Sequence, residues 1–390
     1  LASAVRRFPP LLDRVDAAED VLALANEIVA TLEAPFTVPL DTDEAVTVSA
    51  SVGLVLGADL ADTAESSGTR VDGEELLRCA DIAMYLAKRG GAGRVVRYEA
   101  GMGDAVLARL QLRSELAAAL DRQEFAVHYQ PTVDLRTGAV HGVEALVRWN
   151  SPSRGLVPPL AFVPTAEESG LIVGLGRWVL AEACRHVAAW QRCHPEHALL
   201  QLAVNVSARE LGEPDLVEQV LGVLARSGLP AASLVLEVTE SLMMADVGQA
   251  AAALEQLRTA GVKVAIDDFG TGYSSLSYLE DLTVDYLKID KSFVDRITAG
   301  RGEFVVIESI LHLGHALGLT VVAEGVEHDS QLEQLRAMEC DYAQGYLFAR
   351  PLPADELEAQ LTAPTGVLHA ARVPTQRVAA GVPRSLSPGD

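Results

Sequence analysis

Residues 262–275 read VKVAIDDFGTGYSS, an apolar run that ends on two acidic residues and a glycine-rich turn. The apolar run predicts a buried strand with Asp267 and Asp268 at its carboxyl end. Because neighbouring strand residues point to opposite faces, both carboxylates can serve one site only where the ladder ends and the backbone turns. We expect Gly270 and Gly272 to allow that turn. Paired carboxylates suit Mg²⁺ or Mn²⁺, which bind phosphate oxygens, although a solvated strand end that caps a helix is the alternative interpretation.

This strand is one of a series, because apolar runs alternate with amphipathic helical runs from about residue 102 onward. Strands are predicted near residues 125–134, 140–148, 199–206, 234–239, 262–267, 286–289, 319–323 and 342–348. The clearest predicted helices lie near residues 173–193, 214–227, 247–260, 303–317 and 329–338, with stops at Gly228, Gly261 and Gly318. Eight such strands in about 250 residues predict an α/β fold of the (β/α)8 TIM-like barrel type.

The first hundred residues carry fewer elements than a closed barrel needs. They predict a partial α+β domain over residues 1–100, with helices near 17–33 and 73–89 and strands at 46–56 and 95–98. Residues 363–390 contain four prolines and no apolar period, which predicts a disordered tail.

Composition narrows the class of ligand and the compartment. The 390 residues carry a formal net charge of -23 and no run of 18 uninterrupted apolar residues, so we expect no membrane segment in this chain. Such acidity argues against a nucleic-acid polymer as partner, whereas a small phosphate ligand fits if metal ions neutralise it. The four cysteines lack CxxC spacing and predict a reducing, cytoplasmic location. A zinc site is the alternative for Cys184, His186, Cys193 and His194, but their irregular spacing favours ordinary helix residues.

Polar residues recur at the carboxyl ends of the predicted strands, where barrels of this class hold their active sites. The set comprises Glu144, Asn205, Glu237, Asp267, Asp268, Lys288, Glu324 and Gln344. Carboxylates buried here need a shared cationic partner, and metal ions provide one. Lys288 is expected to orient water or stabilise a transition state, with a salt bridge to Asp290 or to a strand-end acid as the alternative. Together the set predicts metal-assisted phosphodiester hydrolysis, although a helix cap or surface role remains the alternative for any single member.

These residues resemble the EAL family of cyclic di-GMP phosphodiesterases over roughly residues 106–362. The motifs follow in family order: EALVR at 144–148, NVS at 205–207, EVTES at 237–241, DDFGTGYSS at 267–275, LKID at 287–290, AEGVE at 323–327 and QGY at 344–346. The resemblance implies a barrel whose first strand is reversed and hydrolysis of cyclic di-GMP to linear pGpG in bacterial signalling. A catalytically silent cyclic di-GMP receptor is the alternative function, and an interaction module on a relic scaffold is a third.

The resemblance also implies a role for each matched residue. Glu144, Asn205, Glu237 and Asp267 would bind one Mg²⁺ or Mn²⁺ ion, with Asp268 and Glu324 serving a second ion or the nucleophilic water. Lys288 would be the catalytic lysine, acting with Glu324. Glu240 would support catalysis by anchoring the mobile loop at 268–275. The remaining matches, Gln130, Arg148 and Gln344, would contact substrate, and family members commonly form homodimers near that loop.

The first hundred residues resemble the C-terminal part of a GGDEF domain, the diguanylate cyclase fold. The matching segments are EAPFTV at 33–38, VTVSASVGLVL at 46–56 and ELLRCADIAMYLAKRG at 75–90. The defining motif is missing, because AVRRFPP stands where it should precede LLDRVD. We therefore expect a degenerate remnant without cyclase activity. Either the chain is truncated relative to a longer sensor protein, or the remnant packs against the barrel or a second subunit.

Overall fold

The computed structural model describes residues 17–37, 45–60, 72–91, 93–240, 247–270, 284–298 and 304–362. The chain divides into two compact units, Leu1–Ser114 and Glu115–Asp390, and each is considered by itself. The boundary falls within helix α4 (Met102–Asp121). The predicted tail at 363–390 and most of the predicted loop at 268–275 lie outside the described residues.

The first unit builds a small α+β core. Helices α1 (Ala18–Glu33) and α3 (Gly73–Arg89) contact the parallel strands β3 (Val52–Leu54) and β4 (Val95–Arg97), near the short helix η1 (Gly57–Leu60). Its buried centre comprises Leu60, Cys79, Ala83 and Tyr98. At Gly53 a β-carbon would lie 2.1 Å from the Met84 backbone nitrogen, so only glycine lets β3 pass this close to α3.

The prediction of one continuous strand over residues 46–56 is wrong. The structure has two short strands there, β2 (Ala45–Val46) and β3, separated by residues 47–51. They pair with different partners, because β2 lies antiparallel to β1 (Phe36–Thr37) while β3 lies parallel to β4. An apolar run divided between two sheets cannot remain one strand.

Among the described residues of the second unit, eight strands close into a barrel. They are β5 (Phe125–Asp134), β6 (Val140–Ser151), β8 (Gln201–Asn205), β9 (Leu234–Thr239), β10 (Lys263–Phe269), β11 (Tyr286–Ile289), β12 (Thr320–Ala323) and β13 (Tyr342–Gln344). Strand β5 is antiparallel to both its barrel neighbours, β6 and β13, and the other neighbours run parallel. The predicted TIM-like barrel with a reversed first strand is therefore confirmed. The short strands β7 (Gly155–Val157) and β14 (Leu352–Pro353) pair with β6 and β5.

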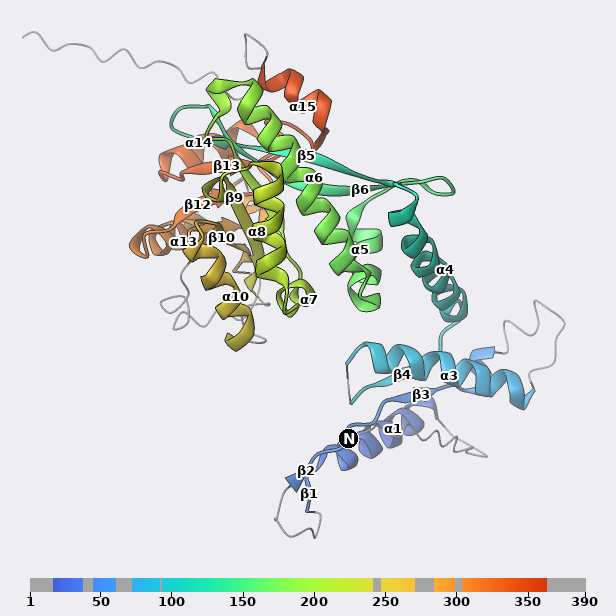
Figure 1. Ribbon diagram of the computed structural model, residues 1–390. Helices are drawn as coiled ribbons and strands as arrows, with labels where there is room; N and C mark the ends of the chain where they lie inside the picture. The colour runs from blue at the N-terminus through green and yellow to red at the C-terminus, as the bar shows by residue number, and fades with distance from the viewer. Residues whose placement is uncertain are drawn as a thin grey trace, which may run out of the picture. The chain divides into compact units, whose positions relative to one another are not determined.

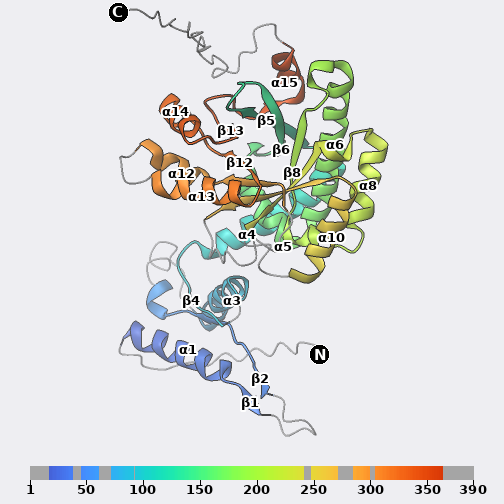
Figure 2. The same ribbon diagram turned by 90° about the vertical axis from the view of Figure 1, so that its left-hand side faces the viewer.

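Helices lie outside these strands, as Figures 1 and 2 show. The main ones are α5 (Pro159–Ser169), α6 (Leu171–Cys193), α8 (Leu216–Ser227), α10 (Val247–Thr259), α13 (Phe304–Ala316), α14 (Asp329–Ala337) and α15 (Ala354–Leu361). The shorter ones are α7 (Ala208–Leu211), α12 (Lys291–Val294), η2 (Pro195–His197), η3 (Ala231–Ser233) and η4 (Asp295–Thr298). The predicted stops at Gly228, Gly261 and Gly318 have φ of 75°, 98° and 74°, the left-handed region that glycine favours. No helix in the described part of the chain is long and apolar enough to cross a membrane.

The barrel interior is layered, and the layering positions the polar residues. An apolar layer comprises Ala203, Val235, Ala265, Tyr286, Val322 and Tyr342. Two residues further along the same segments stand Asn205, Glu237, Asp267, Lys288, Glu324 and Gln344. Since strand side chains repeat every two residues, these six polar residues continue the same inward-facing rows. They form a polar layer at the carboxyl end of the barrel.

Strand β13 ends at Gln344, so the predicted extension to residue 348 is wrong. At Gly345 a β-carbon would lie 2.1 Å from the Val326 carbonyl oxygen. The Val326 N–H donates to the Gln344 carbonyl at 3.0 Å, and the Leu347 N–H donates to the Val326 carbonyl at 2.9 Å. The chain therefore leaves the barrel ladder to bond with this neighbouring loop.

Candidate active site

Lys288 stands at the centre of the polar layer, with 3% of its side chain exposed. Its Nζ lies 2.6 Å from Glu324 Oε1 and 2.8 Å from Glu237 Oε1. Asp267 Oδ1 is 3.2 Å away and Glu144 Oε2 is 3.9 Å away. The sequence left two salt bridges open for Lys288, and the one with strand-end acids is present. Asp290 instead caps α12, where its side chain accepts from the Ser292 N–H.

One ammonium group does not balance the surrounding carboxylates. Burial raises the pKa of Glu237 well above its ordinary value, against the opposing effect of Lys288. Burial also raises the pKa of Glu324, and it raises that of Asp268, where a neighbouring aspartate adds repulsion. For Lys288, burial alone would lower the pKa, but the facing carboxylates raise it well above its ordinary value. These shifts show that one ammonium group is too little to keep all the carboxylates ionised, and a bound cation would favour their ionised forms.

Asp267 and Asp268 turn toward the same site although they are adjacent on β10. Asp268 has a φ of 54°, and the register between β10 and β11 shifts between Ile266 and Phe269. The Asp268 N–H donates to Asp267 Oδ1 at 3.0 Å. This differs from the sequence expectation, which assigned the turn to the glycines. Gly270 also has a positive φ of 94°, but the first left-handed residue of the segment is Asp268 itself.

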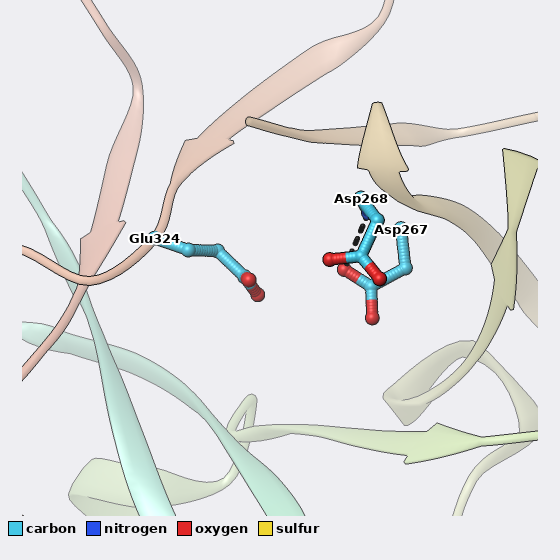
Figure 3. Close-up of side chains that lie close together, drawn as sticks. All are labelled: Asp267, Asp268 and Glu324. Atoms are coloured by element: carbon cyan, nitrogen blue, oxygen red, sulfur yellow. Dashed lines mark hydrogen bonds between the residues drawn. The ribbon is translucent and has the colours of Figure 1, made fainter. Parts of the chain in front are cut away.

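Figure 3 shows the carboxylate of Glu324 pointing toward those of Asp267 and Asp268. Each of the three offers an oxygen, and these oxygens lie within 4.8 Å of one another. Glu324 follows β12, and its N–H donates to the Ile289 carbonyl of the adjoining strand at 3.0 Å, which holds its backbone beside Lys288. Clustered carboxylate oxygens are the donors that divalent cations such as Mg²⁺ and Mn²⁺ prefer.

A second network surrounds Glu144. Its Oε1 accepts from Asn205 Nδ2 at 2.7 Å and its Oε2 accepts from Gln344 Nε2 at 2.5 Å. Gln344 Nε2 also donates to Gln130 Oε1 at 3.1 Å. Gln130 and Gln344 are only 7% and 5% exposed. The structure thus brings both glutamines into the polar layer beside a carboxylate, while their predicted substrate contacts stay a prediction.

The other two predicted residues, Arg148 and Glu240, have backbone partners. Arg148 shares a face of β6 with Glu144, four residues further along, and its guanidinium donates to the Val147 carbonyl at 2.9 Å. Glu240 lies just after β9, and its Oε2 accepts from the Gly270 N–H at 3.0 Å. Glu240 therefore holds the backbone two residues beyond Asp268.

Thr132 is a site neighbour that the sequence did not single out. Its hydroxyl donates to Gln344 Oε1 at 3.0 Å. The sequence could have indicated this neighbour, because Thr132 lies two residues after Gln130 on one strand and so shares its face.

The cysteines and histidines for which zinc was an alternative have other surroundings. Cys184 is buried in α6, His186 Nδ1 lies 2.7 Å from the Tyr129 hydroxyl, and His194 Nε2 lies 2.9 Å from Glu358 Oε1.

Comparison with known proteins gives a consistent result for the second unit. The family model described as EAL domain matches residues 113–351, which is more than half of the chain. A solved structure described as "PaMucR Phosphodiesterase, c-di-GMP complex" is similar with a TM-score of 0.61 and 44% identity. The similarity covers 63% of this chain and 99% of that one.

Two curated proteins of Pseudomonas aeruginosa are similar over more of the chain. One is the bifunctional diguanylate cyclase/cyclic di-GMP phosphodiesterase MucR, with 40% identity over 342 residues, covering 88% of this chain and 48% of MucR. The other is the cyclic di-GMP phosphodiesterase NbdA, with 42% identity over 290 residues, covering 74% of this chain and 37% of NbdA. The chain therefore spans about half the length of MucR and less of NbdA.

Proposed function

Because the chain belongs to the EAL domain family, we propose that it is a metal-dependent phosphodiesterase that hydrolyses cyclic di-GMP to linear pGpG in bacterial signalling. Membership confirms the family resemblance inferred from the motifs. The names of MucR and NbdA include this activity, and the similar MucR structure is described as a c-di-GMP complex. The observation that carries the proposal is Lys288, which is buried within 4.0 Å of four carboxylates.

The donor set fits two divalent cations. Five carboxylates surround one ammonium group, namely Glu144, Glu237, Asp267, Asp268 and Glu324 around Lys288. When all are ionised, four negative charges remain, which two divalent ions would balance. Glu237 Oε2 is buried and has no hydrogen-bond partner among the described residues. An ionised oxygen left in this state is costly, and a bound cation would remove that cost.

We assign ion binding from these positions. Glu144, Asn205, Glu237 and Asp267 would hold one Mg²⁺ or Mn²⁺ ion, and Asp268 and Glu324 would hold a second. When bound, such ions stabilise charge on the phosphate oxygens and activate the attacking water. The two-ion assignment is supported by the oxygens of Asp267, Asp268 and Glu324, which lie within 4.8 Å of one another.

Two residues would act in the reaction itself: Lys288 on the developing negative charge and Glu324 on the proton of the attacking water. A water molecule attacks phosphorus, a P–O bond to water forms and the P–O bond to the 3′ oxygen of one ribose breaks, which leaves the phosphate on the 5′ side. The Lys288 ammonium stabilises the charge that develops on the phosphate, and Glu324 accepts a proton from the water. The departing 3′ oxygen takes up a proton from solvent and becomes a hydroxyl group, and Glu324 returns its proton to solvent afterwards. Arg148, Gln130 and Gln344 are the proposed substrate contacts, and Glu240 supports the loop that follows Asp268.

The first unit is proposed to be a degenerate, partial GGDEF domain without cyclase activity. The similarity to MucR, whose name includes diguanylate cyclase, extends over 88% of this chain and so reaches beyond the barrel. We further propose a homodimer formed through the barrel and a cytoplasmic location, the latter from the four free cysteines.

A cyclic di-GMP receptor without turnover is the competing function. The two are separated by incubating the chain with cyclic di-GMP and Mn²⁺ while ligand binding and pGpG formation are measured in parallel. Turnover that is lost in Glu144→Gln supports the enzyme. Equal binding by the parent and Glu144→Gln, with no pGpG from either, supports the receptor. Lack of both binding and turnover supports the third alternative, an interaction module that does not use cyclic di-GMP.

A further inference from the structure

Strand β5 lies antiparallel between β6 and β13, so its residues face partners on both of these strands. Thr132 is opposite Gln344 in one ladder, and Gln130 is opposite Glu144 in the other. Residues 130 and 132 share a face of β5, so all four side chains meet inside the barrel. The reversed first strand therefore connects a threonine to a carboxylate of the polar layer.

The direction of the hydrogen bonds in this group is determined at one end. The Ala349 carbonyl oxygen can only accept, and Gln130 Nε2 donates to it at 3.1 Å. Gln130 Oε1 is then left to accept from Gln344 Nε2 at 3.1 Å. The same Nε2 donates to Glu144 Oε2 at 2.5 Å. Gln344 Oε1 consequently faces Thr132, whose hydroxyl donates to it at 3.0 Å.

This orientation matters for the carboxylate. A reversed Gln344 amide would set its Oε1 against Glu144 Oε2, so that two acceptors would repel. With the observed orientation, both oxygens of Glu144 accept from amides, and Asn205 directs its Nδ2 to Glu144. Asn205 can then present its Oδ1 to a cation. Because Gln344 is almost fully buried, an unpaired Oε1 would cost free energy in this orientation.

We propose that Thr132 is a positioning residue for cation binding, which holds the Gln344 amide so that it orients Glu144. The inference rests on the proposed function, because it deepens the assignment of Glu144 as a metal ligand. Thr132 acts through Gln344 and contributes no ligand of its own. Its hydroxyl, rather than its volume, is the required group.

The test compares Thr132→Val with Thr132→Ser in the full chain. Valine keeps the shape and removes the hydroxyl, whereas serine keeps the hydroxyl. Mn²⁺ binding without substrate is measured by the loss of the free Mn²⁺ electron paramagnetic resonance signal. We expect about tenfold weaker binding in Thr132→Val, the lower end of what outer partners of a metal ligand contribute, and recovery in Thr132→Ser. Thr259→Val, which loses a hydroxyl bonded to the Glu255 carbonyl in α10, is the matched control.

Two results would overturn the positioning role. One is parent-like Mn²⁺ binding in Thr132→Val, and the other is equally weak binding in Thr132→Ser, which would make shape the cause. Thermal melts in EDTA establish folding, and Thr132→Ala supplies the same readout if the valine variant does not fold. A parent that binds Mn²⁺ in a Thr132-dependent way but forms no pGpG would refute the proposed function and leave the positioning role standing.

Discussion

The backbone N–H of Asp268 donates to the carboxylate of Asp267 at 3.0 Å, while Asp268 itself has a φ of 54°. This pair of observations explains how two adjacent strand residues reach one site. The left-handed residue breaks the alternation of the strand, and the hydrogen bond holds the two carboxylates together (Figure 3). An aspartate tolerates this conformation better than most residues.

Replacing Asp268 tests where the backbone turns. Both Asp268→Gly and Asp268→Ala remove the carboxylate, but only alanine keeps a β-carbon at positive φ. In EDTA, we expect the glycine variant to be more stable toward urea by about 1 kcal/mol. The same pair at Asp295, where φ is -60°, should show the opposite order. Equal stability of the two Asp268 variants would locate the turn elsewhere.

Cation binding should stabilise the fold, because the clustered carboxylates that would bind the ion are brought together only in the folded chain. At a Mn²⁺ concentration 100 times the dissociation constant, we expect about 2.7 kcal/mol of added stability. EDTA should remove this added stability, because it withdraws Mn²⁺ from the chain. Urea denaturation with and without Mn²⁺ measures the effect, with Ca²⁺-free buffer in both arms. An unchanged midpoint at millimolar Mn²⁺ would count against the metal site.

Lys288→Met removes the ammonium while keeping much of the side-chain volume. We expect kcat to fall by about 10²- to 10³-fold at saturating Mn²⁺, because the charge that stabilises the transition state is lost. Without metal, the variant should be less stable, since the carboxylates lose their partner. Mn²⁺ should therefore stabilise it more than it stabilises the parent. Near-parental turnover would show that Lys288 has no catalytic role.

His141, which is not one of the candidate site residues, should make the stability of the fold depend on pH. Its ring stacks on Tyr342 with centroids 3.9 Å apart, and burial, assisted by Lys263, lowers its pKa to about 4. Below its unfolded pKa of about 6.5, the unfolded chain binds the extra proton. Stability is therefore full above that pH and falls as the pH drops toward 4. In EDTA, His141→Phe should lose less stability than the parent between pH 7 and pH 5, by about 1–2 kcal/mol.

The exposed His312, changed to Gln, is the control for that comparison. If His141→Phe and the parent lose the same stability over this interval, the buried ring does not contribute to the acid sensitivity of the fold.

Gly53→Val should destabilise the first unit, because a β-carbon there would lie 2.1 Å from the Met84 nitrogen and 2.2 Å from the Ala80 carbonyl oxygen. We expect a cost of about 3 kcal/mol, the upper end of what overpacking a core usually costs. Gly57→Ala is the control, since nothing lies within 4 Å of its β-carbon position. Calorimetry should show that the unfolding transition of the barrel is unchanged in both variants. A shift of the barrel transition in Gly53→Val alone would show that the two units unfold together.

The polar layer was predictable because strand side chains repeat every two residues. Val235, Ala265, Tyr286 and Val322 face the barrel interior, so residues two positions later continue the same rows. The choice of partner for Lys288 was not predictable, because Asp290 is nearer in sequence but turns away to cap α12. The two-residue repeat of strand side chains and the order of the strands determine which residues share the barrel interior. Local helix capping determines which acidic residues remain free to pair with Lys288.

Three features depended on contacts distant in sequence. The left-handed Asp268 accompanies a register shift against β11, which no local pattern in residues 262–275 reveals. Strand β13 stops where Gly345 approaches Val326, and the run at 46–56 divides because its halves pair with different strands. Each deviation arises from a tertiary partner that overrides a local preference.

The most direct measurement follows cyclic di-GMP in heavy-oxygen water by mass spectrometry, with the chain and Mn²⁺ present. Metal-dependent attack by water predicts pGpG that carries one heavy oxygen on its 5′ phosphate, with formation abolished by EDTA and strongly reduced in Lys288→Met. Unchanged cyclic di-GMP beside a folded, Mn²⁺-loaded chain would contradict the assignment of this barrel as a phosphodiesterase.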